Sequence, residues 1–149
     1  MRYDKIWGKI LGSDEKVEVE FSIGDTYRKF GLIVWGIISL PLIFAFGLGI
    51  ITFLIALFYY NYYLKVANAY AFTNKRVLVH RGWLSTHTIS VDYAKITDIH
   101  ITEPFLDRII THTGNIAIIT AGSTLDQAVL RHVQSPYEIK KQLDILKDK

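Results

Sequence analysis

The longest apolar pattern in the chain runs from Phe30 to Leu64 and contains no Asp, Glu, Lys, Arg or His. As one helix it would be about 52 Å long, whereas the hydrocarbon core of a bilayer is about 30 Å thick. Gly47 and Gly49 lie near its middle, and glycine pairs interrupt helices. The pattern therefore predicts a helical hairpin with arms at about 30–46 and 50–65, each just long enough to span a membrane.

A buried hairpin in a soluble core is the alternative. It is disfavoured because a chain of 149 residues has little protein left to cover two uncharged helices. Basic residues flank both ends of the hairpin (Arg28, Lys29 and Lys65), whereas its tip carries no charge. By the positive-inside rule, this asymmetry predicts a multi-pass protein of the cell membrane with both termini in the cytoplasm.

Two short patterns precede the apolar stretch. Residues 2–11 place Tyr3, Ile6, Trp7, Ile10 and Leu11 on one helical face. Such a segment lies among lipid headgroups, docks as a short helix on the protein itself or is a frayed terminus, and the pattern leaves these open. Residues 16–22 alternate apolar and acidic positions, which is typical of a half-buried strand. We expect that strand to join a sheet formed by the chain after residue 65, because a lone strand is unstable.

Short strand patterns follow from about residue 69 to residue 133. Ile96 is out of phase with Ile99 and Ile101 in the segment 95–102, which predicts either a β-bulge or a late strand start. Residues 105–110 are predicted to form a helical turn that buries its four apolar residues: Phe105, Leu106, Ile109 and Ile110.

The chain ends in a predicted amphipathic helix. Ser135, Pro136 and Glu138 form a capping-box pattern, and Ile139, Leu143 and Leu146 follow on one face. Several short strands closed by one such helix predict a small antiparallel barrel or sandwich.

The order and spacing of several motifs resemble the bacterial PH domain family. An extended opening is formed by Tyr70, Phe72, Thr73, Asn74 and Arg76. It is followed by Arg81–Gly82, by Lys95, Ile96, Asp98 and Ile99, by Phe105 and Arg108, and by Gly114, Ile116, Ile118, Thr120 and Gly122. Thr111–His112 departs from the family pattern, which commonly has a glycine there. The resemblance implies two roughly orthogonal antiparallel sheets capped by the last helix, and often two hydrophobic helices before them.

Pattern and composition together predict an α+β membrane protein in three parts. We expect an N-terminal cytoplasmic segment at 1–29, a transmembrane helical hairpin at 30–65 and a PH-like domain at 66–149. Hydrophobic residues make up 50% of the chain although 21% of residues are charged, which is typical of an apolar block set in soluble sequence. Cysteine is absent, so disulfides and thiolate chemistry are excluded.

The sequence gives little indication of catalysis, so we expect no enzyme, no catalytic residues and no cofactor. His80 and His87 are placed on one face of a predicted hairpin and are the strongest metal candidate, but no cysteine or spaced acidic residue accompanies them, so we expect no metal site. Asp98 and His100 share a strand face, yet no nucleophile motif accompanies them. The mild net charge of +3 also argues against nucleic acid as a partner.

One basic surface remains as a candidate site for membrane-surface or lipid contact. Its residues are Lys75, Arg76, Arg81 and Trp83. Two functions are then open. The chain is either a membrane-anchored adaptor that binds a membrane or cytoplasmic protein, or a second copy of itself, or a module that reads anionic headgroups with this basic hairpin. We favour the adaptor, because an anchored domain needs no lipid recognition for recruitment and gains effective concentration for partners on the same membrane.

Overall fold

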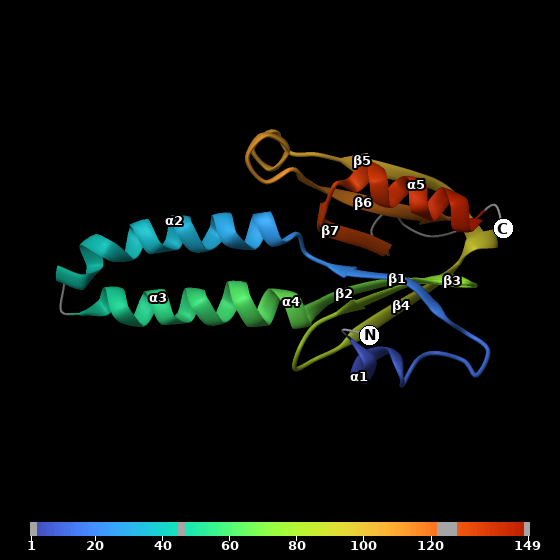
Figure 1. The fold of residues 1–149 in the computed structure, drawn as a ribbon, viewed down its shortest axis with the longest axis horizontal. Helices are drawn as coiled ribbons and strands as arrows, with labels where there is room; N and C mark the ends of the chain where they lie inside the picture. Colours follow the sequence, from blue (N-terminus) through green and yellow to red (C-terminus); the bar gives the residue numbers. More distant parts are fainter. Residues whose placement is uncertain (1–2, 45–46, 122–127, 148–149) are drawn as a thin grey trace.

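The computed structural model describes residues 3–44, 47–121 and 128–147. It has an antiparallel two-sheet body from which a long helical hairpin projects to one side (Figure 1). The body also carries a short helix α1 (Asp4–Trp7) near the N-terminus and a longer helix α5 (Pro136–Lys147) near the C-terminus.

The hairpin consists of α2 (Asp25–Phe44) and a second helical run. That run comprises α3 (Leu48–Phe58), the π-helical turn η1 (Tyr59–Tyr63) and α4 (Leu64–Ala67). α2 begins five residues before the predicted arm, because its first turn is polar and joins Asp25 to Arg28 in an ion pair. Gly47 has φ of 72°, a left-handed conformation that glycine adopts without strain, and it precedes the second run, which begins at Leu48 rather than at about residue 50.

Gly49 has a different role from the predicted turn. It lies inside α3, where a Cβ would come within 2.3 Å of the Ser39 carbonyl oxygen on α2. Nearer to the sheet, the Tyr60 ring packs against Gly31, where an added Cβ would be 2.1 Å from Tyr60 Cε1. The helices are therefore closely packed at both levels, as small residues allow.

The first sheet has the order β1-β2-β3-β4, with β1 (Val17–Ser22), β2 (Asn68–Thr73), β3 (Arg76–Arg81) and β4 (His87–Asp92). Pairing of β1 with β2 confirms that the strand before the hairpin joins the sheet after it. In space, the sheet therefore combines residues from two of the three predicted sequence segments. The hairpin leaves it after β1 and returns directly into β2 (Figure 1).

The second sheet has the order β5-β6-β7, with β5 (Ile96–Thr102), β6 (Thr113–Thr120) and β7 (Ala128–Gln134). The 3₁₀ turn η2 (Tyr93–Lys95) links the sheets, and the π-helical turn η3 (Asp107–Thr111) links β5 to β6. The register of β5 against β6 shifts between Ile96 and Asp98 and the strand begins at Ile96, which favours the predicted bulge over a late strand start.

The main core lies between the sheets and under α5. Its largest fully buried members are Tyr70, Phe72, Val77, Val79, Ile116, Leu130, Val133 and Leu143. Ile139 and Leu146 pack against this core, so the predicted stripe of α5 is confirmed. The helix begins at Pro136 as expected, but the expected cap by the Ser135 hydroxyl is not seen among the described residues. Instead, the Ser135 backbone carbonyl accepts hydrogen bonds from the N–H groups of Glu138 and Ile139.

A second, smaller core covers the outer face of the first sheet. Trp7 of α1 is completely buried there and packs with Tyr3, Ala69, Ala71 and Leu78. The N-terminal segment therefore docks on the protein, which is one of the three alternatives that its amphipathic pattern allows.

One predicted burial is wrong. The apolar residues of the turn between β5 and β6 are exposed: Phe105, Leu106, Ile109 and Ile110. The turn is held by its polar residues instead, since the Thr111 hydroxyl donates to the Asp107 carbonyl and pairs with the buried Thr113 hydroxyl.

Candidate functional site

Two of the predicted surface residues lie at the end of the sheet farthest from the hairpin. Lys75 is exposed in the β2–β3 turn, and Arg76 begins β3. The Arg76 guanidinium donates to both carboxylate oxygens of Glu15, at 2.8 and 2.7 Å. It also donates to the Ile10 carbonyl and to the Ser90 hydroxyl. Arg76 is therefore a structural tie between the N-terminal segment and the sheet.

Electrostatics support this structural role. The Glu15 side chain is 3% exposed, and its hydrogen bonds from Arg76, together with that from the Thr73 hydroxyl, outweigh desolvation and lower its pKa to about 2. The same pairing raises the pKa of Arg76. This charge-assisted pair keeps the Arg76 side chain turned toward the protein.

The other two predicted residues lie at the opposite end of β3. Arg81 is five residues after Arg76, about 17 Å away along an extended strand, and its guanidinium donates to the Val129 carbonyl of β7. Trp83 follows in the β3–β4 turn, where its ring lies against Phe58, Tyr62 and Tyr63. The four predicted residues are therefore not one surface, and only Arg81 and Trp83 lie near the base of the hairpin.

A groove that the sequence did not indicate lies beside Trp83. It has a volume of about 330 Å³ and runs between α1 and the β3–β4 hairpin. Lys5 of α1 and Lys9 of the turn after it border the groove, and both are exposed. His80 lines its floor with a hydrogen bond of 2.9 Å to the Thr88 hydroxyl, and burial lowers the pKa of that imidazole. The groove thus combines two cations with an aromatic ring.

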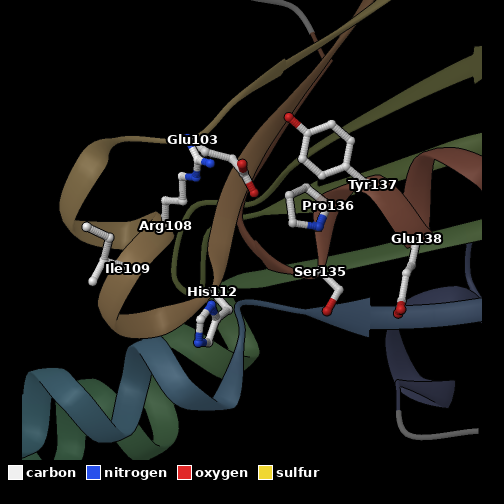
Figure 2. A pocket seen from close by; sticks show the side chains of 8 residues that line it. All are labelled: Glu103, Arg108, Ile109, His112, Ser135, Pro136, Tyr137 and Glu138. Atoms are coloured by element: carbon white, nitrogen blue, oxygen red, sulfur yellow. The ribbon is translucent and has the colours of Figure 1, made fainter.

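A larger groove, of about 740 Å³, lies between η3 and the start of α5. Figure 2 shows Arg108 and Ile109 on the loop at one side and Tyr137 and Glu138 on α5 at the other. Glu103 also lines it, so the single arginine faces two carboxylates, which disfavours selective binding of an anion. His112 and Ser135 share the groove, but no hydrogen bond joins their side chains among the described residues, so no nucleophile–base pair is formed.

Below this groove, η3 is connected to the hairpin by a stack of side chains. Asp107 Oδ2 lies 3.1 Å from Nδ1 of His132 on β7, and the His132 ring stacks on Tyr27 of α2 at a centroid distance of 3.9 Å. Burial lowers the pKa of His132, and Asp107 partly offsets that effect. The stack fixes η3 at the level of the first turn of α2.

The two sequence-based catalytic and metal alternatives have different outcomes. Asp98 and His100 do share a face of β5, with 2.9 Å between Oδ2 and Nε2, and both are exposed. The expectation that His80 and His87 share a face is wrong, because the register pairs His80 with Thr88 and His87 with Arg81. Within residues 3–44, 47–121 and 128–147, no group of three His, Cys, Asp or Glu residues could hold a metal ion.

The chain matches the family model described as bacterial PH domain over residues 20–147. It belongs to the bacterial PH domain family. Two solved structures share its fold. One is a DUF1696 family protein with a pleckstrin-homology domain from Shewanella loihica PV-4, with 13% identity, a TM-score of 0.53, and coverage of 98% of this chain and 94% of that one. The other is a pleckstrin homology domain from Shewanella amazonensis SB2B, with 11% identity, a TM-score of 0.55, and coverage of 99% and 97%. No curated protein matches the chain.

The structure shows what the motif residues do in this bacterial PH domain. Thr73 donates to Glu15 at 2.7 Å, and the Asn74 side-chain oxygen accepts from the Lys16 N–H at 3.0 Å. Together with Arg76, they hold the segment before β1 against the sheet. The extended opening motif is therefore structural here.

The departure at Thr111–His112 is also explained. His112 has φ of 50°, in the left-handed region that glycine enters most easily. This bacterial PH domain thus keeps the backbone conformation for which a glycine would be suited, and places an imidazole beside the larger groove.

Proposed function

We propose that this bacterial PH domain is a membrane-anchored, non-catalytic module that acts as a protein-interaction adaptor at the cytoplasmic face of the cell membrane. The observation that carries the proposal is the free edge of the first sheet. β4 pairs with β3 on one side, and no described strand pairs with its other side. His87, Thr88 and Ser90 on this strand are exposed. An open edge can accept an extended segment of a partner as an added strand.

The hairpin supports the anchoring part of the proposal. Both helical runs are long and apolar enough to cross a membrane, and only 11% and 17% of their apolar segments are buried. A core helix of a soluble protein would be mostly buried. The outward residues are large and aliphatic: Ile33, Ile37, Ile38, Leu40, Ile50, Ile51, Leu54 and Ile55. Lipid is the surrounding that removes this surface from water.

Anchoring makes weak edge binding sufficient. A partner on the same membrane meets β4 at a raised effective concentration, so a short segment can bind without a large interface. The partner class is a membrane or cytoplasmic protein with an extended segment. A second copy of the chain could supply the same kind of strand.

Recognition of an anionic headgroup is the second candidate function. The groove that Lys5, Lys9 and Trp83 border favours it, because lysines near an anionic leaflet each contribute about 1 kcal/mol and tryptophan suits the interface. The basic hairpin residues favour it less, since Arg76 and Arg81 are used inside the protein.

Site-specific photocrosslinking separates the two functions. A photoreactive side chain replaces His87 on β4 in the full chain, and a matched chain carries it at the exposed Lys141 on α5. In native membranes, the adaptor proposal expects a discrete protein adduct from position 87 and none from 141. The double variant Lys5→Glu/Lys9→Glu should keep that adduct.

Two observations together would overturn the adaptor proposal. No protein adduct forms at position 87, and the full chain in vesicles retains one anionic lipid selectively at about 0.5 M salt, where screening shortens to about 4 Å. If the Lys5→Glu/Lys9→Glu variant then loses that selectivity, headgroup recognition replaces the adaptor function.

A further inference from the structure

Two loops flank the base of the hairpin and expose large apolar side chains. One is the turn around η3, where the exposed fractions are 74% for Phe105 and 65% for Leu106, with Ile109 and Ile110 beside them. The other is the β3–β4 turn, where Leu84 is 90% exposed next to Trp83. We propose that both loops lie in the headgroup and upper acyl region of one bilayer leaflet, so that the domain is seated on the membrane at two points besides its anchor.

The polarity of η3 is inverted relative to a turn that faces water. Two of its three polar side chains point into the protein, while Arg108 is exposed: Thr111 is buried, and the largely buried Asp107 carboxylate lies against His132. Its apolar side chains point outward. A turn with polar contacts inside and isoleucine, leucine and phenylalanine outside is suited to an apolar surrounding.

The height of η3 along the hairpin matches the membrane boundary. Through His132, Asp107 is connected to Tyr27, which lies three residues before the uncharged stretch begins at Phe30. Figure 1 shows the loop between β5 and β6, drawn in orange, extending over the start of α2. Its apolar side chains therefore lie where the hairpin passes from charged to uncharged sequence.

The β3–β4 turn reaches the same height on the other helical run. Trp83 contacts Phe58, Tyr62 and Tyr63 around η1. Tyr60 of η1 in turn packs against Gly31 of α2, one residue after the uncharged stretch begins. The two loops thus mark one plane across the hairpin, and this plane coincides with its tyrosine-rich segment. Aromatic belts of this kind lie at membrane–water interfaces.

Basic side chains complete the match to an anionic leaflet. Arg108 is exposed and lies in the sequence between Leu106 and Ile109 of the η3 turn. Lys29 is exposed at the end of the hairpin nearest the domain. Continuity of these loops with the uncharged hairpin favours lipid over a protein partner as their surrounding. The inference rests on the proposed membrane anchoring of the hairpin.

Fluorescence depth measurements on the full chain test the proposal. The natural chain has no cysteine, so a single cysteine can carry an environment-sensitive dye at Leu106, at Leu84, at Ile37 in the middle of α2, or at Lys141 on α5. The labelled proteins are reconstituted in vesicles of phosphatidylcholine with about one third phosphatidylglycerol. Some of these vesicles carry a nitroxide near the top of the acyl chain.

We expect emission at positions 106 and 84 to shift to the blue and to be quenched at least about twofold more strongly than at 141, as for side chains about 5–10 Å below the headgroups. Position 37 reports the anchor separately. Lipid contact at 37 with water exposure at both 106 and 84 would overturn the inference and leave the anchor intact. Water exposure at 37 would overturn the anchoring itself.

A blue shift at 106 and 84 without quenching by the labelled lipid would mean that protein covers the loops, and would also overturn the inference. The double variant Phe105→Ser/Leu106→Ser provides a control for folding. Because both side chains are exposed, it should unfold in detergent at the same temperature as the natural chain. In vesicles, it should lose the quenching at position 84 if the two loops seat the domain together.

Discussion

At the residue scale, the Glu15–Arg76 pair shows how a candidate binding residue is used inside the fold. A basic residue in a β-turn region is an ordinary membrane-contact candidate, but its carboxylate partner lies far away in sequence, before β1. Local patterns do not reveal such a pair. They also do not reveal the register that places His80 and His87 on opposite faces, because alternation within one strand does not determine how two strands pair.

The depressed pKa of Glu15 predicts a pH dependence of stability. Its pKa is about 2 in the folded chain and 4.5 when unperturbed, so the pair stabilises the fold fully above about pH 4.5, and this contribution is lost as the pH falls toward 2. Glu15→Gln should cost about 2 kcal/mol at pH 7, the range of charged hydrogen bonds. Chemical unfolding of the full chain in detergent measures both effects.

Asp14→Asn, in the same loop but exposed, provides the control and should be nearly neutral at pH 7. If Glu15→Gln leaves the pH dependence between 4.5 and 2 unchanged, Glu15 is not the group responsible.

Two glycines of the hairpin give a matched pair of substitutions. Gly49→Ala places a methyl group within 2.3 Å of the Ser39 carbonyl oxygen, whereas at Gly36 the nearest atom, in Phe53, is 3.7 Å away. We expect Gly49→Ala to destabilise the hairpin by about 1–3 kcal/mol through overpacking. Gly36→Ala should be tolerated or mildly stabilising. Thermal unfolding in detergent, followed by helical circular dichroism, compares them, and equal effects would contradict the close approach at Gly49.

At the element scale, features that follow from the spacing of apolar side chains were predictable, whereas the surroundings of short apolar segments were not. The strands, the bulge after Ile96 and the buried stripe of α5 follow from side-chain alternation and helical spacing. The apolar pattern at Phe105–Ile110 predicts burial, yet the turn is exposed, because such a pattern does not show what covers the residues. The pattern around Trp7 leaves its docking open for the same reason.

Helix α5 offers a test of the core. Leu143 is completely buried between the sheets, whereas Ile145, two residues further, is 61% exposed. Leu143→Ala should cost about 2–5 kcal/mol by leaving a cavity. Ile145→Ala should change the free energy of unfolding by less than about 0.5 kcal/mol. Urea unfolding of the full chain in detergent measures both, and similar losses for the two variants would refute the assigned face.

At the scale of the whole molecule, the family and the fold were predictable from the motif order, and the helical hairpin from the uncharged length and its central glycines. The candidate surfaces were not predictable, because the open edge of β4, the groove between α1 and the β3–β4 turn, and the exposed turn around η3 share no sequence pattern. They follow from how distant segments pack together in the fold.

The topology of the anchor has a direct test. Cysteine at Ser13 or at Lys141, both exposed, should resist an impermeant thiol reagent in intact cells and react after permeabilisation. The charge asymmetry at Arg28, Lys29 and Lys65 is the reason for this expectation. Labelling of either position in intact cells would place that end of the chain outside.

The connection of the hairpin to the sheet restricts how the domain can move. β1 reaches α2 through Ile23 and Gly24 alone, and α4 passes into β2 without any intervening residue. The two helical runs are thus joined to neighbouring strands by short connections. The sheet therefore cannot rotate independently of the hairpin, as it could on a single flexible linker. A bilayer that thins or thickens changes the tilt of its helices. With the hairpin spanning the bilayer as proposed, such a tilt would rotate the whole sheet together with the helices. The angle between β4 and the membrane plane would therefore change with bilayer thickness.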